Sequence, residues 1–250
     1  MWPDNAEELE RLQVELAARW RREPAWFPPT DRVPRVGGLF VASARGAEGI
    51  GSADEPAWVA AVVLEVPRSE FRVPRFPAGH VLGTPNSEPG TTVLESTVVH
   101  ATFDAPYVAG LLAMREGRLL AEAVDALETE PDVLIVNASG RDHPRRAGLA
   151  LHLGAACGLP TIGVTDRPLL ASGPEPGPQR GDVAELVLEA EVVGYRLRTR
   201  GGARPVVVHA GWRVDAQTAC TVVLQVSRRS RTPAPLREAR RLARTARSAL

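Results

Sequence analysis

Lysine is absent from this chain. All thirty basic residues among the 250 are arginine, and thirty acids balance them, so the formal net charge is zero. Any mechanism that needs a lysine ammonium group is therefore excluded. The balanced composition gives no indication of a surface adapted to nucleic acid or to a membrane.

Cysteines and long hydrophobic runs are also scarce. Cys157 and Cys220 are isolated and lie in stretches with regularly spaced apolar residues, which is typical of small buried residues in a reducing compartment. No apolar run reaches the length of a membrane span, and the first ten residues lack the features of a signal peptide. We expect a soluble, cytoplasmic protein with no membrane association.

The most informative stretch is DVLIVNASGRDHPRRAGLALHLGAACGLPTIGV, residues 132–164. Residues 133–136 and 161–164 are short apolar runs that predict buried strands. Between them, His143-Pro144 predicts the start of a helix that ends at Gly158. A strand, a crossover helix and a parallel strand follow from this order. Ligands bind beyond the carboxyl ends of such strands, so residues 137–144 and 165–168 are the candidate functional loops.

The rest of the chain alternates in the same way. Helices are expected at residues 6–23, 119–127 and 216–226, strands at 36–42, 58–66, 92–101, 192–199 and 205–210, and an irregular excursion at 67–90. This order predicts an α/β fold in which helices flank both faces of a mixed central β-sheet.

A basic segment ends the chain. The predicted domain spans residues 1–228, and the basic segment after it spans residues 229–250. From residue 228 to the end there is a single acid, Glu238, and there are arginines at 228, 229, 231, 237, 240, 241, 244 and 247. Apolar residues line one stripe of this segment. It is either a basic amphipathic helix that contacts phosphates or a frayed, solvated tail.

Several motifs occur in a recognisable order. They are APYVAG at 105–110, RE at 115–116, HPRRAGLALHLG at 143–154, LPTIGV at 159–164, VVGYRLRTR at 192–200 and RPVVV at 204–208. Together they resemble the endonuclease V family, which nicks nucleic acid beside deaminated bases such as hypoxanthine. The resemblance covers residues 6–228 and implies a ribonuclease H-like fold, a DNA-repair family and, in active members, Mg²⁺.

Four positions depart from the pattern of that family. Phe40 and Asn137 stand where the family has aspartates, Asp166 where it has a lysine, and Trp212 where it has a histidine; only Glu116 is retained. Mg²⁺ is usually held by carboxylates, and loss of one acid–base group alone costs ~10²–10⁴-fold in rate. We therefore expect a catalytically degenerate chain that binds no metal or other cofactor.

The resemblance also implies a nucleic-acid-binding set. It comprises Pro106, Tyr107, Val108, Gly140, His143, Arg145 and Arg146. Tyr107 and its neighbours would insert beside a base, since stacking is worth ~1–3 kcal/mol per base, or would form a turn packed on a helix. The two arginines would contact phosphate at a helix start, or would be solvated or salt-bridged.

The altered positions allow several local interpretations. Phe40 and Trp212 are expected to form an apolar plug, with the ring of Phe40 between Glu116 and Asn137. Glu116 is expected to be a first-turn helix acid paired with Arg145 or Arg146. A relocated carboxylate pair of Asp166 with Glu116 is the weaker alternative, and His209 is expected to be a strand histidine.

Three functions are compatible with these observations. The first is a degenerate endonuclease V homologue that binds nucleic acid or a protein partner at the old active-site face. The second is an active metal-dependent endonuclease, with a rearranged site, that cleaves inosine-containing DNA or RNA. The third is a nucleotide- or small-ligand-binding module. The four departures favour the first.

Overall fold

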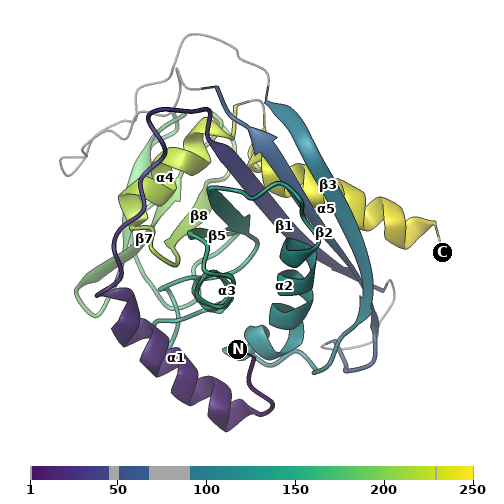
Figure 1. Cartoon of the computed structure of the whole chain (residues 1–250). Coiled ribbons are helices and arrows are strands. Elements are labelled where there is room, and N and C mark those ends of the chain that lie inside the picture. Colours follow the sequence, from purple (N-terminus) through teal and green to yellow (C-terminus); the bar gives the residue numbers. More distant parts are fainter. Residues whose placement is uncertain (1, 45–50, 68–90, 229, 250) are drawn as a thin grey trace.

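The computed structural model describes residues 2–44, 51–67, 91–228 and 230–249 (Figure 1). The excursion expected at 67–90 lies outside these residues, apart from Pro67. No helix in the described ranges has both the length and the apolar content that crossing a membrane requires.

A mixed sheet of eight strands forms the centre of the described structure, in the order β3-β2-β1-β4-β5-β8-β7-β6. The strands are β1 (Arg35–Ser43), β2 (Pro56–Glu65), β3 (Thr92–Thr102), β4 (Val133–Val136), β5 (Thr161–Thr165), β6 (Val183–Leu188), β7 (Glu191–Leu197) and β8 (Val206–Ala210). β4 pairs in parallel with β1 and β5, and the other pairs are antiparallel. The expected mixed sheet is confirmed.

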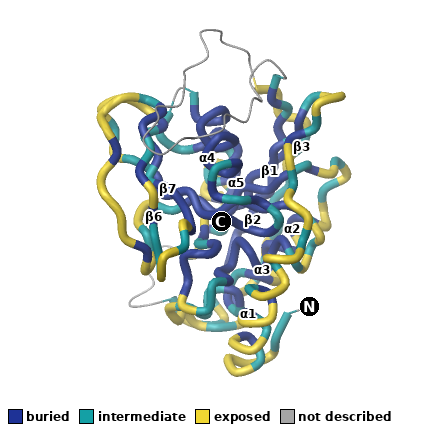
Figure 2. The backbone as a smooth tube through the Cα atoms, turned by 90° about the vertical axis from the view of Figure 1, so that its left-hand side faces the viewer, coloured by how far each residue is buried: buried dark blue, intermediate teal, exposed yellow. Residues whose placement is uncertain are grey.

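Helices cover both faces of this sheet (Figure 1). One face carries α1 (Ala6–Trp20), α2 (Arg118–Asp125) and α3 (Leu149–Cys157), and a π-helical turn, η2 (Ala113–Gly117), leads into α2. The other face carries α4 (Ala216–Gln225) and α5 (Ala234–Ser248). Figure 2 shows the central strands as the most deeply buried part of the chain.

Alternation along the central strands assigns each residue to one face. In β4, Leu134 and Val136 pack on the α2–α3 side, whereas Val133 and Ile135 pack on the α4 side. In β1, Leu39 packs beneath α2 and Val36 lies in the cluster beneath α4. Because side chains alternate with period two, these assignments also fix the direction of the residues at the strand ends.

Two local features differ from the sequence prediction. The central helix starts at Leu149, not at His143, because Arg146 has a φ of 58° and the N–H of Gly148 bonds to the carbonyl of Gly140. The predicted end is confirmed, with Gly158 as a left-handed cap. Strand β6 was not predicted: it lies at the edge of the sheet, and its alternation is weak.

The basic C-terminal segment forms a packed helix and not a frayed tail. Ala239 and Ala243 of α5 are fully buried against Ala60 and Val62 of β2. At its start, Pro235 lies so close to Gly38 in β1 that any Cβ at residue 38 would overlap its backbone. The apolar stripe of α5 is therefore part of the hydrophobic core.

The position of α5 against β1 can be tested with Gly38→Ala. The added methyl meets the backbone of Pro235, which cannot move unless α5 moves, so we expect a loss of about 1–3 kcal/mol in unfolding free energy. Gly201→Ala is the control, since its Cβ would meet only ordinary contacts, the nearest at 3.8 Å. Urea titrations of both variants measure the difference. Equal stability of the two would contradict this position of α5.

Candidate functional site

Three of the four altered positions lie on neighbouring strands and project from one face. Leu39 is paired with Val136, so Phe40 lies level with Asn137, at the end of β4. Alternation directs Phe40, Asn137 and, beyond β5, Asp166 to the face that carries α4 and α5. Asn137 is exposed. These residues therefore lie close together near the carboxyl ends of the central strands, as the strand–helix–strand unit implied.

The ring of Phe40 lies against α5. The guanidinium carbons of Arg240 and Arg244 are 4.9 and 5.9 Å from its centroid, and the ring is half-buried among apolar residues of β2 and α5. The expectation that it fills the space between Glu116 and Asn137 is wrong, because its neighbour Leu39 takes the face that carries α2.

Trp212 is in a separate cluster. It is 2% exposed and packs with Leu16, Ala147 and Leu151 between α1 and α3. Arg19 lies over its ring, 5.0 Å from the centroid. Phe40 and Trp212 therefore do not form a common plug, since each packs with helices of a different face.

Asp166 is committed to an ion pair. Its Oδ1 accepts a hydrogen bond of 2.6 Å from Nη1 of Arg231, and this bond is the main reason that the pKa of Asp166 lies below its ordinary value. The relocated pair with Glu116 does not form, because the carboxylate is neutralised by arginine on the α5 side.

Glu116 lies in η2 and not in the first turn of α2. The expected partners bind elsewhere: Arg145 pairs with Glu10 at 3.2 Å, and Arg146 pairs with Glu189 at 3.0 Å. Burial raises the pKa of Glu116 to about 7, opposed by the neighbouring Arg115. The acid that the family pattern retains is therefore an isolated, poorly hydrated carboxyl group.

These residues do not fit a magnesium site. The described residues contain no group of three or more histidine, cysteine, aspartate or glutamate side chains able to hold a metal ion. Phe40 has no ligand atom, Asn137 offers a neutral oxygen, and Asp166 is paired with Arg231. Mg²⁺ needs carboxylate anchors, and this donor set does not supply them.

The loop with Tyr107 is exposed and its base is fixed. Tyr107 and Val108 are 44% and 45% exposed, so they do not form the packed turn that was the alternative interpretation. The carbonyl of Gly110, at the base, accepts hydrogen bonds from Arg145 at 3.1 Å and from Gln13 at 3.4 Å. A loop whose lower part is held in place and whose exposed tip carries an aromatic ring suits insertion beside a nucleobase.

The residues expected to contact phosphate instead bind protein groups in and around the loop with Tyr107. His143 is buried, its Nε2 lies 3.1 Å from the carbonyl of Gly110, and burial lowers its pKa to about 4, so it is neutral at pH 7. Arg145 also donates to Gln13 at 2.6 Å. Arg146 donates to the carbonyl of Leu188.

Two further positions support the same region. Gly140 has no room for a Cβ, which would overlap the carbonyl of Ala210 in β8. The sequence reasoning missed Gln13, although it is a polar residue on the apolar stripe of α1. It is 1% exposed and bonded both to Arg145 and to Gly110.

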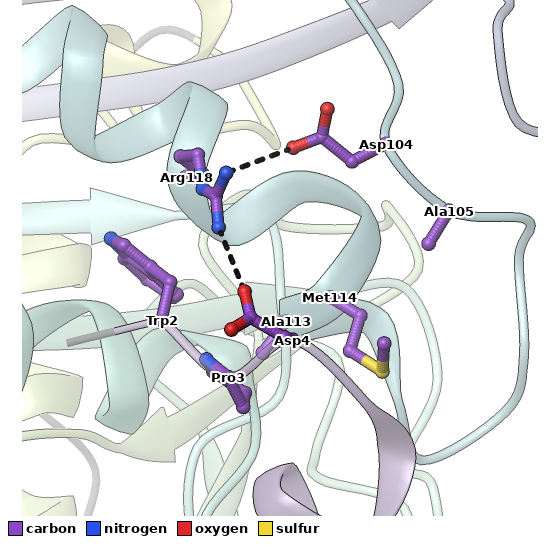
Figure 3. A pocket seen from close by; sticks show the side chains of 8 residues that line it. All are labelled: Trp2, Pro3, Asp4, Asp104, Ala105, Ala113, Met114 and Arg118. Atoms are coloured by element: carbon purple, nitrogen blue, oxygen red, sulfur yellow. Dashed lines mark ion pairs between the residues drawn. The ribbon is translucent and has the colours of Figure 1, made fainter.

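A small cavity of about 160 Å³ lies between residues 2–4, at the N-terminus, and residues 104–105, at the start of the loop with Tyr107 (Figure 3). Arg118 lies between Asp4 at 3.8 Å and Asp104 at 3.9 Å, and Trp2 and Met114 also line the cavity. Because two carboxylates flank the one arginine, the cavity is not a phosphate site.

Comparison with known proteins identifies the family. The sequence model of Endonuclease V matches residues 78–241. This chain belongs to the endonuclease V family. The endonuclease V of Nocardia farcinica is 48% identical over 166 residues, which are 66% of this chain and 71% of that protein.

Solved structures of the family have the same fold. The endonuclease V of Streptomyces avermitilis superposes with a TM-score of 0.78 at 35% identity, over 99% of this chain and 95% of that one. The Ciona intestinalis endonuclease V, solved with a DNA 24mer containing an inosine followed by a ribo-adenosine, has a TM-score of 0.71 at 21% identity over 97% of both chains. The ribonuclease H-like fold is thereby confirmed. The region matched by the family model contains Glu116, Asn137, Asp166 and Trp212, but Phe40 precedes it.

The isolated carboxyl group of Glu116 predicts a pH-dependent stability. Its pKa of about 7 in the folded chain exceeds the ordinary 4.5, so the neutral form stabilises the fold below pH 4.5, and this contribution is lost as the pH rises through 7. Glu116→Gln stays neutral. We expect it to be more stable than the parent at pH 8, by up to roughly 3 kcal/mol, and equal to it near pH 4.

Thermal melts at the two pH values measure this difference. Glu122→Gln, on the exposed side of α2, controls for the removal of one negative charge. A Glu116→Gln variant whose advantage over the parent does not change with pH would show that the carboxyl group is well hydrated.

Proposed function

We propose that this member of the endonuclease V family binds nucleic acid without metal-dependent cleavage. The observation that carries the proposal is the set of side chains on β1 and just beyond the ends of β4 and β5: Phe40, Asn137 and an Asp166 neutralised by Arg231. Phosphodiester hydrolysis by a metal mechanism needs an anchored ion that lowers the pKa of the attacking water. These side chains provide no such anchor.

Nucleic acid as the partner is supported by three observations. Relatives in the family are named endonucleases, and the Ciona protein was solved with DNA containing inosine. The exposed loop around Tyr107 retains an aromatic tip on a fixed base. The face beside Phe40 carries arginines of α5. The free thiols of Cys157 and Cys220 support a reducing compartment, and we propose the cytoplasm.

A second candidate is an active endonuclease with a rearranged site. It is favoured by Glu116, whose raised pKa indicates a carboxyl group that a bound cation would stabilise, and by the 48% identity to a protein named endonuclease V. Its weakness is that the described residues contain no group of three or more potential metal ligands around Glu116 or elsewhere.

Cleavage assays separate the two candidates. Purified protein with Mg²⁺ or Mn²⁺ should not nick inosine-containing DNA or RNA above a buffer control, because Glu116 is the one carboxylate retained among the matched metal positions. The Glu116→Ala variant is assayed in parallel. Metal-dependent nicking that disappears in Glu116→Ala would establish the rearranged site and refute our proposal.

Binding should depend on the exposed aromatic tip. Tyr107→Ala removes a stacking surface worth ~1–3 kcal/mol, so we expect the Kd for a single-stranded oligonucleotide to rise roughly ten- to hundred-fold with an unchanged melting temperature. Phe27→Ala is the matched control, because Phe27 is an exposed aromatic (61%) outside the loop. Fluorescence anisotropy measures both. An equal effect of the two variants would show that Tyr107 has no special role.

A further inference from the structure

Two arginines of α5 have no acidic partner. The helix contains five arginines and one acid, Glu238. Arg237 and Arg241 pair with Glu238, and Arg247 donates to the carbonyl of Ser43. Within the described part of the chain, Arg240 and Arg244 form no ion pair and their side chains donate no hydrogen bond; both are held over the ring of Phe40.

The position of this pair is electrostatically unfavourable without an anion. Burial and the nearby charges of Arg244 and Arg231 lower the pKa of Arg240, and only Asp166 opposes them. Asp166 is already bonded to Arg231. The buried Nε of Arg240 has no hydrogen-bond partner. Arg231 and Arg240 therefore share the single carboxylate of Asp166, and Arg244 adds a further positive charge beside Arg240, which leaves positive charge and unused donors.

An anion beside Arg240 and Arg244 would be stabilised by the surplus positive charge and by the unused N–H donors. A guanidinium held over an aromatic ring is attracted by the ring's face, while its N–H groups remain available at its edge. Guanidinium groups match phosphate in a bidentate geometry. The pair also lies beside the carboxyl ends of parallel strands, where open α/β sheets bind ligands.

We propose that Arg240 and Arg244, supported by Phe40, bind a backbone phosphodiester of single-stranded nucleic acid. This inference rests on the proposed nucleic-acid function and names the residues that carry it. Two arginines one helical turn apart, with Asn137 exposed beside them, suit a ligand with repeated charges. No covalent step is involved.

The test compares two double variants of α5. Arg240→Gln with Arg244→Gln should raise the Kd for a single-stranded oligonucleotide at least roughly ten-fold at low salt. It should also lower the slope of log Kd against log salt by about 1 to 2, since each phosphate contact contributes ~0.7 on single strands. Arg237→Gln with Arg241→Gln removes the same charge from the same helix and should leave both quantities near the parent values. Thermal melts establish that each variant is folded.

Two further variants keep the test decisive if the glutamine pair does not fold. Arg240→Lys with Arg244→Lys retains the charge but loses the bidentate fork, so affinity should fall while the salt slope is kept. Phe40→Leu removes the ring and keeps an apolar side chain, and it should weaken binding in the same direction.

Each failure has a distinct meaning. If both arginine pairs weaken binding equally, the contact is diffuse, so this inference is overturned while the proposed function stands. If the parent protein binds no oligonucleotide at low salt, the proposed function fails as well. If polyglutamate competes as effectively as the oligonucleotide at equal ionic strength, the site recognises an acidic protein partner and the inference is wrong.

Discussion

The contact between Pro235 and Gly38 sets the position of α5, and the chemistry of the α5 face depends on it. Only a residue without a Cβ allows the backbone of the helix start to lie so close to β1. Ala239 and Ala243 continue the close approach along β2. Because α5 is fixed at this distance, the longer side chains beside its apolar stripe must lie over Phe40. A helix displaced outward by one side chain would not place them there.

The altered positions form a consistent set when their charges are considered together. Carboxylates at residues 40 and 137 would face the arginines of α5, and ion pairs with Arg240 and Arg244 would compete with any metal. Asp166 already illustrates this outcome, since its carboxylate is bonded to Arg231. Replacing aspartate by phenylalanine at residue 40 removes a charge and supplies a surface on which two guanidinium groups rest. The lack of carboxylates at residues 40 and 137 is thus electrostatically compatible with the arginines that lie over Phe40.

Much of the fold could be predicted because the central strands are short apolar runs with clear boundaries. The π-helical turn around Glu116 could not, since no local pattern distinguishes it from a helix start. Alternation in β1 indicated that Leu39 and Phe40 face opposite sides. It did not show which helix covers each side, because that depends on the distant Pro235. The supporting role of Arg145 depends in the same way on Gln13, which is 132 residues away in sequence.

The two faces of the sheet have diverged in different directions from the family pattern. On the α1–α3 face, the base of the loop with Tyr107 is fixed by Gln13, His143 and Arg145, and its tip remains exposed. On the α5 face, Phe40 offers no ligand atom and two arginines of α5 lie over its ring. Positioning a nucleic-acid strand requires contacts to its nucleobases and backbone phosphates. Metal-dependent cutting of that strand requires an ion held by carboxylates. Among the described residues, an exposed aromatic tip and unpaired arginines, without anchored carboxylates, agree with the proposed role of holding nucleic acid without hydrolysing it.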